Sequence, residues 1–263
     1  MVKEFTGDWA LILGGSSGLG LASAKKLAQH GMNICVIHRD RKSSVERIEK
    51  DFQEITAYGV ELLSYNIDAT RSDKRKEAIE KLAAQISGKG TIKCLVHSLS
   101  KGNLKAMVSD EAPVLQNDDF HLTIDAMAIS LYDWTRTLFD AKLFSDNASI
   151  IAFTSEGNTK AWKHYAAVSA AKAALEAITR NIALEFAPYG IRANCIQAGV
   201  TDTPSLRMIP GNEQLRAFAV KRNPNKRLTV PEDVAGVVYL LCKEEAAWIN
   251  GTVIPVDGGE HIS

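Results

Sequence analysis

The sequence predicts an α/β protein built on one doubly wound parallel sheet of about seven strands, with helices on both faces. Apolar strand-like runs alternate with helical patterns along almost the whole chain, which is typical of parallel strands joined by right-handed helical crossovers. The strand-like runs are nearly continuous in apolar residues, as expected when both faces of a sheet are covered. The 263 residues contain no internal repeat, low-complexity stretch or linker, so we expect a single domain over residues 1–263.

The expected strands are short apolar runs, and the expected helices between them carry apolar residues at helical spacing. The strands are Trp9–Leu13, Met32–His38, Val60–Tyr65, Ile92–His97, Ala148–Thr154, Ile191–Gln197 and Thr252–Val256. The helices are Leu19–His30, Ser43–Tyr58, Lys74–Ser87, Phe120–Phe144, Tyr165–Phe186 and Pro231–Cys242. Residues 101–117 and 203–224 break this alternation after the carboxyl ends of strands, where open α/β sheets bind ligands. We expect residues 203–224 to form a substrate-covering segment, with an ordinary surface excursion as the alternative.

Composition argues against several classes of partner. With 46% hydrophobic residues, 24% charged residues and a formal net charge of zero, we expect neither nucleic acid nor an anionic membrane as the main partner. No apolar stretch approaches the roughly 20 residues of a membrane span, and the first residues do not resemble a signal peptide. The cysteines lie in apolar runs without CxxC spacing, so we expect buried reduced thiols and no metal site. These are Cys35, Cys94, Cys195 and Cys242. We therefore expect a cytoplasmic protein.

A glycine-rich turn, Gly14-Gly-Ser-Ser-Gly18-Leu-Gly20, joins the first expected strand to the first helix. Glycines allow the backbone to turn tightly and to approach a pyrophosphate, while the helix N-terminus offers free N–H groups to the phosphates. In this strand–turn–helix context the motif predicts a Rossmann-type dinucleotide site rather than a turn without a ligand. The residues expected to contact the dinucleotide here are Gly14, Ser16, Ser17, Gly18, Leu19 and Gly20.

The end of the second expected strand indicates which dinucleotide binds. An acidic residue there accepts hydrogen bonds from the adenosine ribose of NAD, whereas arginine suits the 2′-phosphate of NADP. Arg39 and Arg41 flank Asp40 at this point. We therefore expect NADPH to be the preferred cofactor, with NADH possible.

Tyr165 and Lys172 lie seven positions apart in a segment with a helical pattern. At about 100° per residue, seven steps make close to two turns, so both side chains lie on one helix face. A lysine ammonium near a phenol favours the phenolate, so we expect a lowered pKa for Tyr165. Such a tyrosine can donate a proton or a hydrogen bond where negative charge develops on a substrate oxygen.

The glycine turn together with Tyr165 and Lys172 resembles the short-chain dehydrogenase/reductase family over nearly the whole chain. Four departures are similar to the divergent enoyl-acyl-carrier-protein reductase branch. Six residues, not three, separate the tyrosine from the lysine. His97-Ser-Leu-Ser100 stands where most members have Asn-Ala-Gly, Met127 where the catalytic asparagine is usual, and Ala198-Gly199 where Pro-Gly is usual. Ser155 stands where the best-known NADH-dependent members have a second tyrosine, which resembles the NADPH-dependent enoyl reductases.

The resemblance implies reduction of the carbon–carbon double bond of an enoyl thioester in fatty acid biosynthesis. It implies a substrate on acyl carrier protein and a homotetramer. It also implies catalysis by Tyr165, Lys172 and Ser155, with a purely structural role at the end of a strand as the alternative for Ser155. Lys172 would also hold the nicotinamide ribose. Further expected cofactor contacts are Asn66, Ile67, Ser98, Leu99, Gly199, Val200, Thr201 and Thr203. An acyl chain needs an apolar slot, and the candidates, which could instead pack on the sheet, are Trp162, Met208, Ile209, Leu215 and Phe218.

Three alternative functions fit the same residues. The first is reduction of a ketone, such as a 3-oxoacyl thioester, by the same fold. The second is reduction of a 2,4-dienoyl thioester. The third is a dinucleotide-binding sensor without turnover, which predicts a damaged catalytic pair, whereas Tyr165 and Lys172 are both present.

Overall fold

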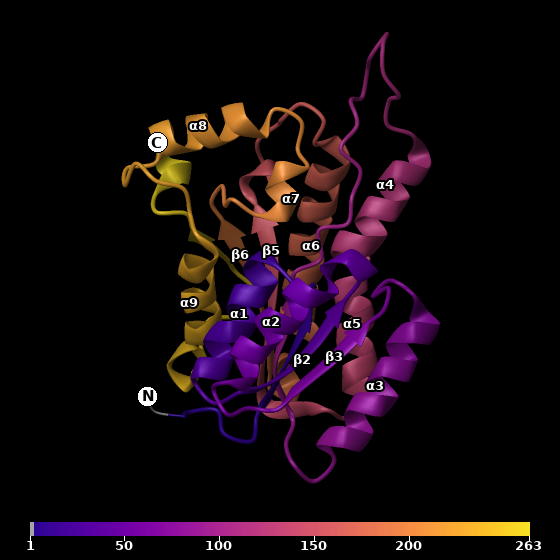
Figure 1. Ribbon diagram of the computed structural model, residues 1–263, viewed down its shortest axis with the longest axis vertical. Helices are drawn as coiled ribbons and strands as arrows, with labels where there is room; N and C mark the ends of the chain where they lie inside the picture. Colours follow the sequence, from indigo (N-terminus) through magenta and orange to yellow (C-terminus); the bar gives the residue numbers. More distant parts are fainter. Residues whose placement is uncertain (1–2) are drawn as a thin grey trace.

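The strands lie side by side in one parallel sheet in the order β3-β2-β1-β4-β5-β6-β7 (Figure 1). The computed structural model describes residues 3–263. The strands are β1 (Trp9–Leu13), β2 (Asn33–His38), β3 (Leu62–Asn66), β4 (Ile92–His97), β5 (Phe144–Ser155), β6 (Ile191–Ala198) and β7 (Val253–Val256). The chain runs outward from β1 to β3 and then returns to β4 on the other side of β1, which creates a topological switch point between β1 and β4. The doubly wound α/β fold predicted from the sequence is confirmed.

Helices cover both faces of this sheet (Figure 1). They are α1 (Gly18–Gln29), α2 (Val45–Thr56), α3 (Ser72–Ile86), α4 (Asn117–Ile124), α5 (Ser130–Asp140), α6 (Ala166–Glu185), α7 (Pro204–Arg207), α8 (Asn212–Arg222) and α9 (Pro231–Cys242). Leu82 of α3, Trp134 of α5 and Leu175 of α6 pack on one face. Leu27 of α1 and Val238 of α9 belong to the core on the opposite face.

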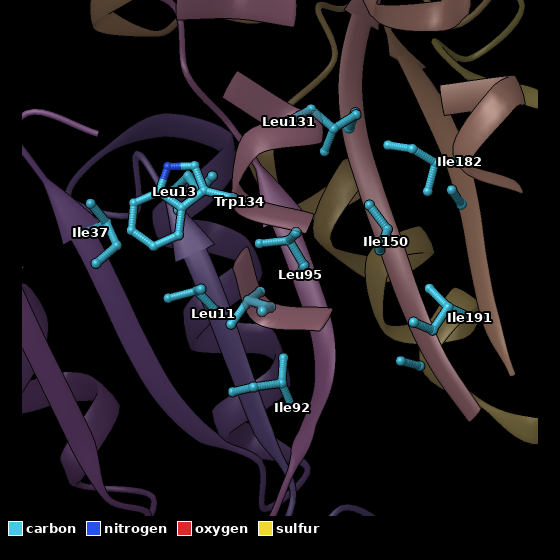
Figure 2. Packing of buried hydrophobic residues seen from close by; sticks show 14 of the residues in the cluster. Leu11, Leu13, Ile37, Ile92, Leu95, Leu131, Trp134, Ile150, Ile182 and Ile191 are labelled. Atoms are coloured by element: carbon cyan, nitrogen blue, oxygen red, sulfur yellow. The ribbon is translucent and has the colours of Figure 1, made fainter. Parts of the chain in front are cut away.

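Alternate residues of each central strand enter the two cores. Figure 2 shows Leu11 and Leu13 of β1 with Leu95 of β4 near Trp134 of α5. Ile12, between the two leucines, belongs to the core on the other face. Because a strand buried on both faces needs an apolar side chain at every position, these strands appear in the sequence as continuous apolar runs. The four cysteines are free and buried, as predicted.

The single helix predicted over Phe120–Phe144 is wrong. The chain forms α4, then one π-helical turn over Asp125–Ile129, then α5, and Phe144 begins β5. The hydroxyl of Ser130 donates to the carbonyl of Ala126 across this turn, at 2.8 Å. α5 ends where Lys142 adopts a left-handed backbone, with φ of 55°. Apolar residues continue through the wider turn and past the helix end, so periodicity in the sequence marked neither of them.

Residues 203–224 fold into α7 and α8 above the carboxyl ends of β5 and β6 (Figure 1). The side chain of Thr203 accepts a hydrogen bond from the N–H of Leu206, and Pro204 occupies the first turn of α7. Gly211, with φ of 76°, separates the two helices. This segment is therefore ordered local structure at the edge of the sheet where the strands end.

Within residues 3–263, no helix is both long and apolar enough to cross a membrane. In the same part of the chain, no cluster of three or more histidine, cysteine, aspartate or glutamate side chains is arranged to hold a metal ion.

Candidate active site

A cleft of about 720 Å³ lies at the carboxyl ends of the strands. It runs from Arg39 after β2, past the glycine turn after β1, to Tyr165 and Lys172 of the α6 region. Most of the residues predicted to contact the cofactor line it. They are Gly14, Ser16, Ser17, Gly18, Leu19, Arg39, Arg41, Ile67, Ser98, Leu99, Lys172, Gly199, Val200, Thr201 and Thr203.

The glycine turn is shaped for a close backbone approach. Gly14 has φ of 81°, and a Cβ added to it would lie 2.5 Å from the carbonyl oxygen of Ser98. α1 begins at Gly18, and the side chain of Ser17 makes no capping hydrogen bond, so the N–H groups of the first turn are available to a ligand. Gly20 was predicted to contact the cofactor, but it does not line the cleft. A Cβ at Gly20 would lie 2.3 Å from the carbonyl oxygen of Gly14, so this glycine allows the helix to pack on the turn. These features fit a dinucleotide pyrophosphate.

At the end of β2, the Asp40 carboxylate is already engaged, because one of its oxygens lies 2.9 Å from Nδ1 of His38. The side chain of Asn66 bonds both the N–H and the carbonyl of Asp40, each at 3.1 Å. Asn66 therefore joins the ends of β2 and β3 and does not line the cleft, contrary to the contact predicted for it. Arg39 is exposed and donates to Asp68 at 2.5 Å.

Sequence reasoning missed two charged groups at this end of the cleft. Asp68 accepts from Arg39 and also from Lys101, whose Nζ lies 3.3 Å away. Both Asp68 and Lys101 line the cleft. Two cations therefore converge on one carboxylate where the adenosine end of a dinucleotide would lie. Asp68 could have been identified from the sequence, because it directly follows Asn66 and Ile67, two predicted cofactor contacts.

Tyr165 is the N-cap of α6 rather than its first helical residue, and its side chain is 8% exposed. Its phenol oxygen lies 3.4 Å from Oγ of Ser155, the last residue of β5. Burial raises the pKa of Tyr165, and the contact with Ser155 offsets this only in part. The predicted lowering of the Tyr165 pKa by Lys172 is therefore wrong for the protein alone. Tyr165 is a neutral phenol and can donate a hydrogen bond.

Lys172 is buried on α6, and its Nζ donates to the carbonyl of Phe153 at 2.6 Å. Burial lowers the pKa of Lys172 to about 8, against weaker raising effects of Cys195 and Glu176. Lys172 and Tyr165 both reach the cleft, as the seven-residue spacing predicted. The lysine thus presents a titratable cation at the deep end of the cleft.

Apolar side chains pack around Tyr165 at this end of the cleft. Met127, Tyr165, Val168 and Ala171 form a small buried cluster, against which Leu104, Ile124, Trp162 and Ile209 pack. The rings of Trp162 and Tyr165 are 5.1 Å apart. The sequence pointed to Trp162 and Ile209 but gave no reason to place Val168 or Leu104 here.

The predicted substrate-pocket residues divide into two groups. Trp162, Ile209 and Leu215 line the cleft. Met208 and Phe218 do not, and they are 75% and 59% exposed. Phe218 instead lies 5.6 Å from the guanidinium of Arg222, on the surface of α8. Helical spacing could not separate the two groups, because α7 and α8 each expose one side to solvent.

An ionic cluster missed by sequence reasoning connects α8 to the rim of the cleft, and it includes Lys160, which donates to Glu156 at 2.5 Å. Arg222 of α8 makes two hydrogen bonds to Glu156, at 3.2 and 2.6 Å, and one to Glu260, at 2.7 Å. Glu260 also accepts from the N–H of Val200, at 3.1 Å. Arg222, Glu156 and Glu260 line the cleft. The partners are far apart in the sequence, so no local sequence pattern indicates this cluster.

A glycine turn at the switch point of a parallel sheet, with a tyrosine and a lysine at the same edge, defines an oxidoreductase that uses a nicotinamide dinucleotide. The family model described as Enoyl-(Acyl carrier protein) reductase matches residues 14–261. The chain belongs to this branch of the short-chain dehydrogenase/reductase family, as its resemblance predicted.

Curated relatives cover almost the whole chain at low identity. A "Probable 2,4-dienoyl-CoA reductase [(2E)-enoyl-CoA-producing]" of Bacillus subtilis is 29% identical, covering 96% of both chains. A 2-dehydro-3-deoxy-D-gluconate 5-dehydrogenase of Formosa agariphila is 26% identical, covering 97% of this chain and 93% of its own. These relatives are named for different substrates, so they support an oxidoreductase rather than one substrate.

Solved structures give the same fold. The enoyl-[acyl-carrier-protein] reductase (NADH) of Aquifex aeolicus is 26% identical with a TM-score of 0.84, covering 98% of both chains. A short chain dehydrogenase of Burkholderia cenocepacia in complex with NADP is 26% identical with a TM-score of 0.83, covering 98% of this chain and 99% of its own. One of these proteins is named with NADH and the other contains NADP, so the comparisons support an NAD(P) cofactor.

Proposed function

We propose that the protein reduces the carbon–carbon double bond of an enoyl thioester carried on acyl carrier protein, with NADPH as the preferred cofactor. The observation that carries this proposal is the position of Tyr165. Its phenol lies where the dinucleotide cleft meets the apolar cluster of Met127, Val168 and Trp162. A conjugated acyl thioester needs both features, an apolar slot for its chain and a hydrogen-bond donor for its carbonyl oxygen.

The cleft residues fit a nicotinamide dinucleotide along its whole length. The first turn of α1 would bind the pyrophosphate, Arg39 and Arg41 the adenosine ribose, and Lys172 the nicotinamide ribose. Bound in this way, the dinucleotide would supply the hydride for the β-carbon of the enoyl thioester.

Tyr165 would stabilise the charge that this reduction places on the thioester oxygen. Because burial raises the Tyr165 pKa, the side chain keeps its proton and donates to that oxygen as the enolate forms. Ser155 is near enough to donate to the same oxygen. Lys172, as an ammonium, favours negative charge in its neighbourhood. The protein thus offers donors fixed in place before the reaction, which is the most effective form of charge stabilisation.

Preference for NADPH is supported by the state of Asp40. His38 occupies its carboxylate and Asn66 holds its backbone, so Asp40 is poorly placed to accept from two ribose hydroxyls. Arg39 bonds only Asp68 and is otherwise exposed. A 2′-phosphate would add a stronger, doubly charged acceptor within reach of Arg39.

A panel of acyl thioesters tests the proposal. NADPH oxidation would be followed with crotonyl, longer 2-enoyl, 2,4-dienoyl and 3-oxoacyl chains, each on acyl carrier protein and on coenzyme A. We expect the highest kcat/KM with a 2-enoyl thioester on the carrier protein. Turnover of 3-oxoacyl thioesters alone would contradict the proposal and leave a ketone reductase.

One comparison favours a second candidate, a 2,4-dienoyl thioester reductase, because the Bacillus subtilis relative carries that name. The same Tyr165 phenol would then face a longer conjugated system. Comparing kcat/KM for 2-enoyl and 2,4-dienoyl chains of equal length separates the two candidates.

A further inference from the structure

His97 is a buried histidine without a role in the chemistry proposed above. It ends β4 and is 1% exposed. Its Nε2 lies 2.8 Å from Oγ of Ser130 at the start of α5. His97 therefore points to the face of the sheet that α5 and α6 cover. A buried imidazole ordinarily has a hydrogen-bonding partner for each ring nitrogen.

The contacts of Ser130 favour the His97 tautomer that carries its proton on Nε2. The Ser130 hydroxyl donates its only hydrogen to the carbonyl of Ala126, at 2.8 Å. It can therefore only accept from His97, so Nε2 carries the ring proton. Nδ1 then has a lone pair, and it is buried without a hydrogen-bond partner among the described residues.

The Lys172 ammonium lies on the same side of the sheet. His97 is paired in register with Ala152 of β5, and Lys172 donates to the carbonyl of the next residue, Phe153, at 2.6 Å. The positive charge of Lys172 contributes, after burial, to lowering the pKa of His97 to about 3. An ammonium has three N–H groups, and one of them is used by Phe153.

No side chain among the described residues is hydrogen-bonded to the Lys172 ammonium. Glu176, one turn further on α6, accepts from Thr154 and Asn158 through one carboxylate oxygen. Cys195 of β6 donates to Thr179, and burial raises the pKa of its thiol to about 11. The neighbouring π-helical turn presents only apolar side chains at its buried positions, Ala126, Met127 and Ala128.

We propose that His97 is a positioning residue for Lys172: its Nδ1 accepts a hydrogen bond from one buried water, which in turn accepts from the Lys172 ammonium. This bond would hold the ammonium on the cleft side of the sheet, where the proposed function needs it for the nicotinamide ribose. It would also favour the charged form of Lys172, because an acceptor lone pair stabilises an ammonium. The inference rests on the role proposed for Lys172.

Two conservative variants separate the two ring nitrogens of His97. The side-chain oxygen of His97→Asn can take the place of Nδ1 but does not reach Ser130. The side-chain amide of His97→Gln can take the place of Nε2 and donate to Ser130, but it leaves no acceptor at the Nδ1 position. If His97 serves Lys172, asparagine preserves its role and glutamine does not. If His97 only joins β4 to α5, the order is reversed.

Fluorescence titration with NADPH between pH 6 and 10 compares the cofactor affinity of the two variants without any acyl substrate. We expect His97→Asn to bind NADPH within about 3-fold of the parent, and His97→Gln to bind about 10-fold more weakly. The loss of affinity at high pH, expected near the Lys172 pKa of about 8, should begin at lower pH in His97→Gln. Equal binding by all three proteins, or loss in His97→Asn alone, would overturn the proposal. Because binding is measured, failure to reduce enoyl thioesters would leave this result intact.

NMR of ¹⁵N-histidine-labelled protein keeps the proposal testable if either variant fails to fold. We expect a neutral His97 with the proton on Nε2, and an Nδ1 resonance that moves downfield in Lys172→Met while the Nε2 resonance stays in place. An Nδ1 resonance unchanged by Lys172→Met would rule out the bond.

Discussion

The Ser155 hydroxyl lies 3.4 Å from the phenol oxygen of Tyr165, joining the end of β5 to the N-cap of α6. This distance is long for an O–H···O hydrogen bond, which is usually near 2.7–2.8 Å. A substrate oxygen between the two hydroxyls can receive two shorter hydrogen bonds in place of this long one. The pair therefore resembles an oxyanion site that substrate binding completes.

Tyr165→Phe removes the hydroxyl proposed to stabilise the enolate. We expect kcat for an enoyl thioester to fall by about 10²–10³-fold, with little change in NADPH affinity. Ser155→Ala is the matched comparison, and we expect a loss of about 10-fold or less because the Tyr165 hydroxyl still donates to the substrate oxygen. Steady-state kinetics with NADPH titrations on each variant measures both quantities. A Tyr165→Phe enzyme with unchanged kcat would remove Tyr165 from the mechanism.

Lys172 should make stability depend on alkaline pH. Its pKa is about 8 in the folded protein, below the usual 10.5, so the unfolded chain binds more protons between these values. The free energy of unfolding due to this group therefore rises with pH across that window, and the cost of the buried charge is fully present below about pH 8. Relative to Lys172→Met, the parent should gain about 1–3 kcal/mol between pH 8 and 10 in urea unfolding. A difference independent of pH would contradict the lowered pKa.

His97 should make the protein sensitive to acid. Its pKa falls from 6.5 to about 3 because burial disfavours the imidazolium, with a smaller effect of Lys172. The stability that this neutral histidine contributes is present above pH 6.5 and is lost as the pH falls toward 3. Between pH 7 and 4, the parent should lose about 2–4 kcal/mol more than His97→Asn in denaturant unfolding. Exposed His121 provides the control, since His121→Asn should follow the parent.

Arg39 should discriminate between the two nicotinamide dinucleotides. Arg39→Ala removes the exposed cation at the adenosine end of the cleft, so we expect KM for NADPH to rise about 10-fold or more. KM for NADH should change less than about 2-fold, because it carries no 2′-phosphate. Exposed Lys42, which does not line the cleft, is the matched control. Equal changes for both cofactors would remove Arg39 from cofactor selection.

Arg222 should hold α8 on the rim of the cleft. Its side chain is 12% exposed, and Arg222→Met leaves the carboxylates of Glu156 and Glu260 close together without their shared cation. We expect a loss of about 2–3 kcal/mol in stability and a higher KM for the acyl substrate. Lys221→Met, at the exposed neighbouring position, should change neither quantity. Thermal unfolding and steady-state kinetics measure the two effects, and an Arg222→Met enzyme with parental Tm and KM would contradict the role of the cluster.

Local sequence patterns predicted the sheet, the glycine turn, and the Tyr165–Lys172 pair, because each depends on residues that lie close together in the sequence. Gly14 adopts a left-handed backbone, which agrees with a glycine at this turn because glycine has no Cβ and takes this conformation without strain. The π-helical turn around Met127 was not predicted, because apolar residues continue through it without a break in the sequence.

The parts of the site that were missed depend on tertiary structure. Arg222 and Glu156 are 66 positions apart in the sequence, so nothing local pairs them. The direction of the Tyr165 pKa shift was predicted wrongly because the sequence gave the nearby lysine but not the extent of burial. Phe218 was assigned to the pocket because composition does not reveal which side of α8 faces solvent.

The most direct test of enoyl reduction is the fate of a deuterium label. The protein would be incubated with a crotonyl thioester and NADPH deuterated at both C4 positions of the nicotinamide, and the product analysed by mass spectrometry. The proposed function predicts a butyryl thioester with one deuterium at C3. Absence of this product, while an acetoacetyl thioester yields deuterated 3-hydroxybutyryl thioester, would contradict it.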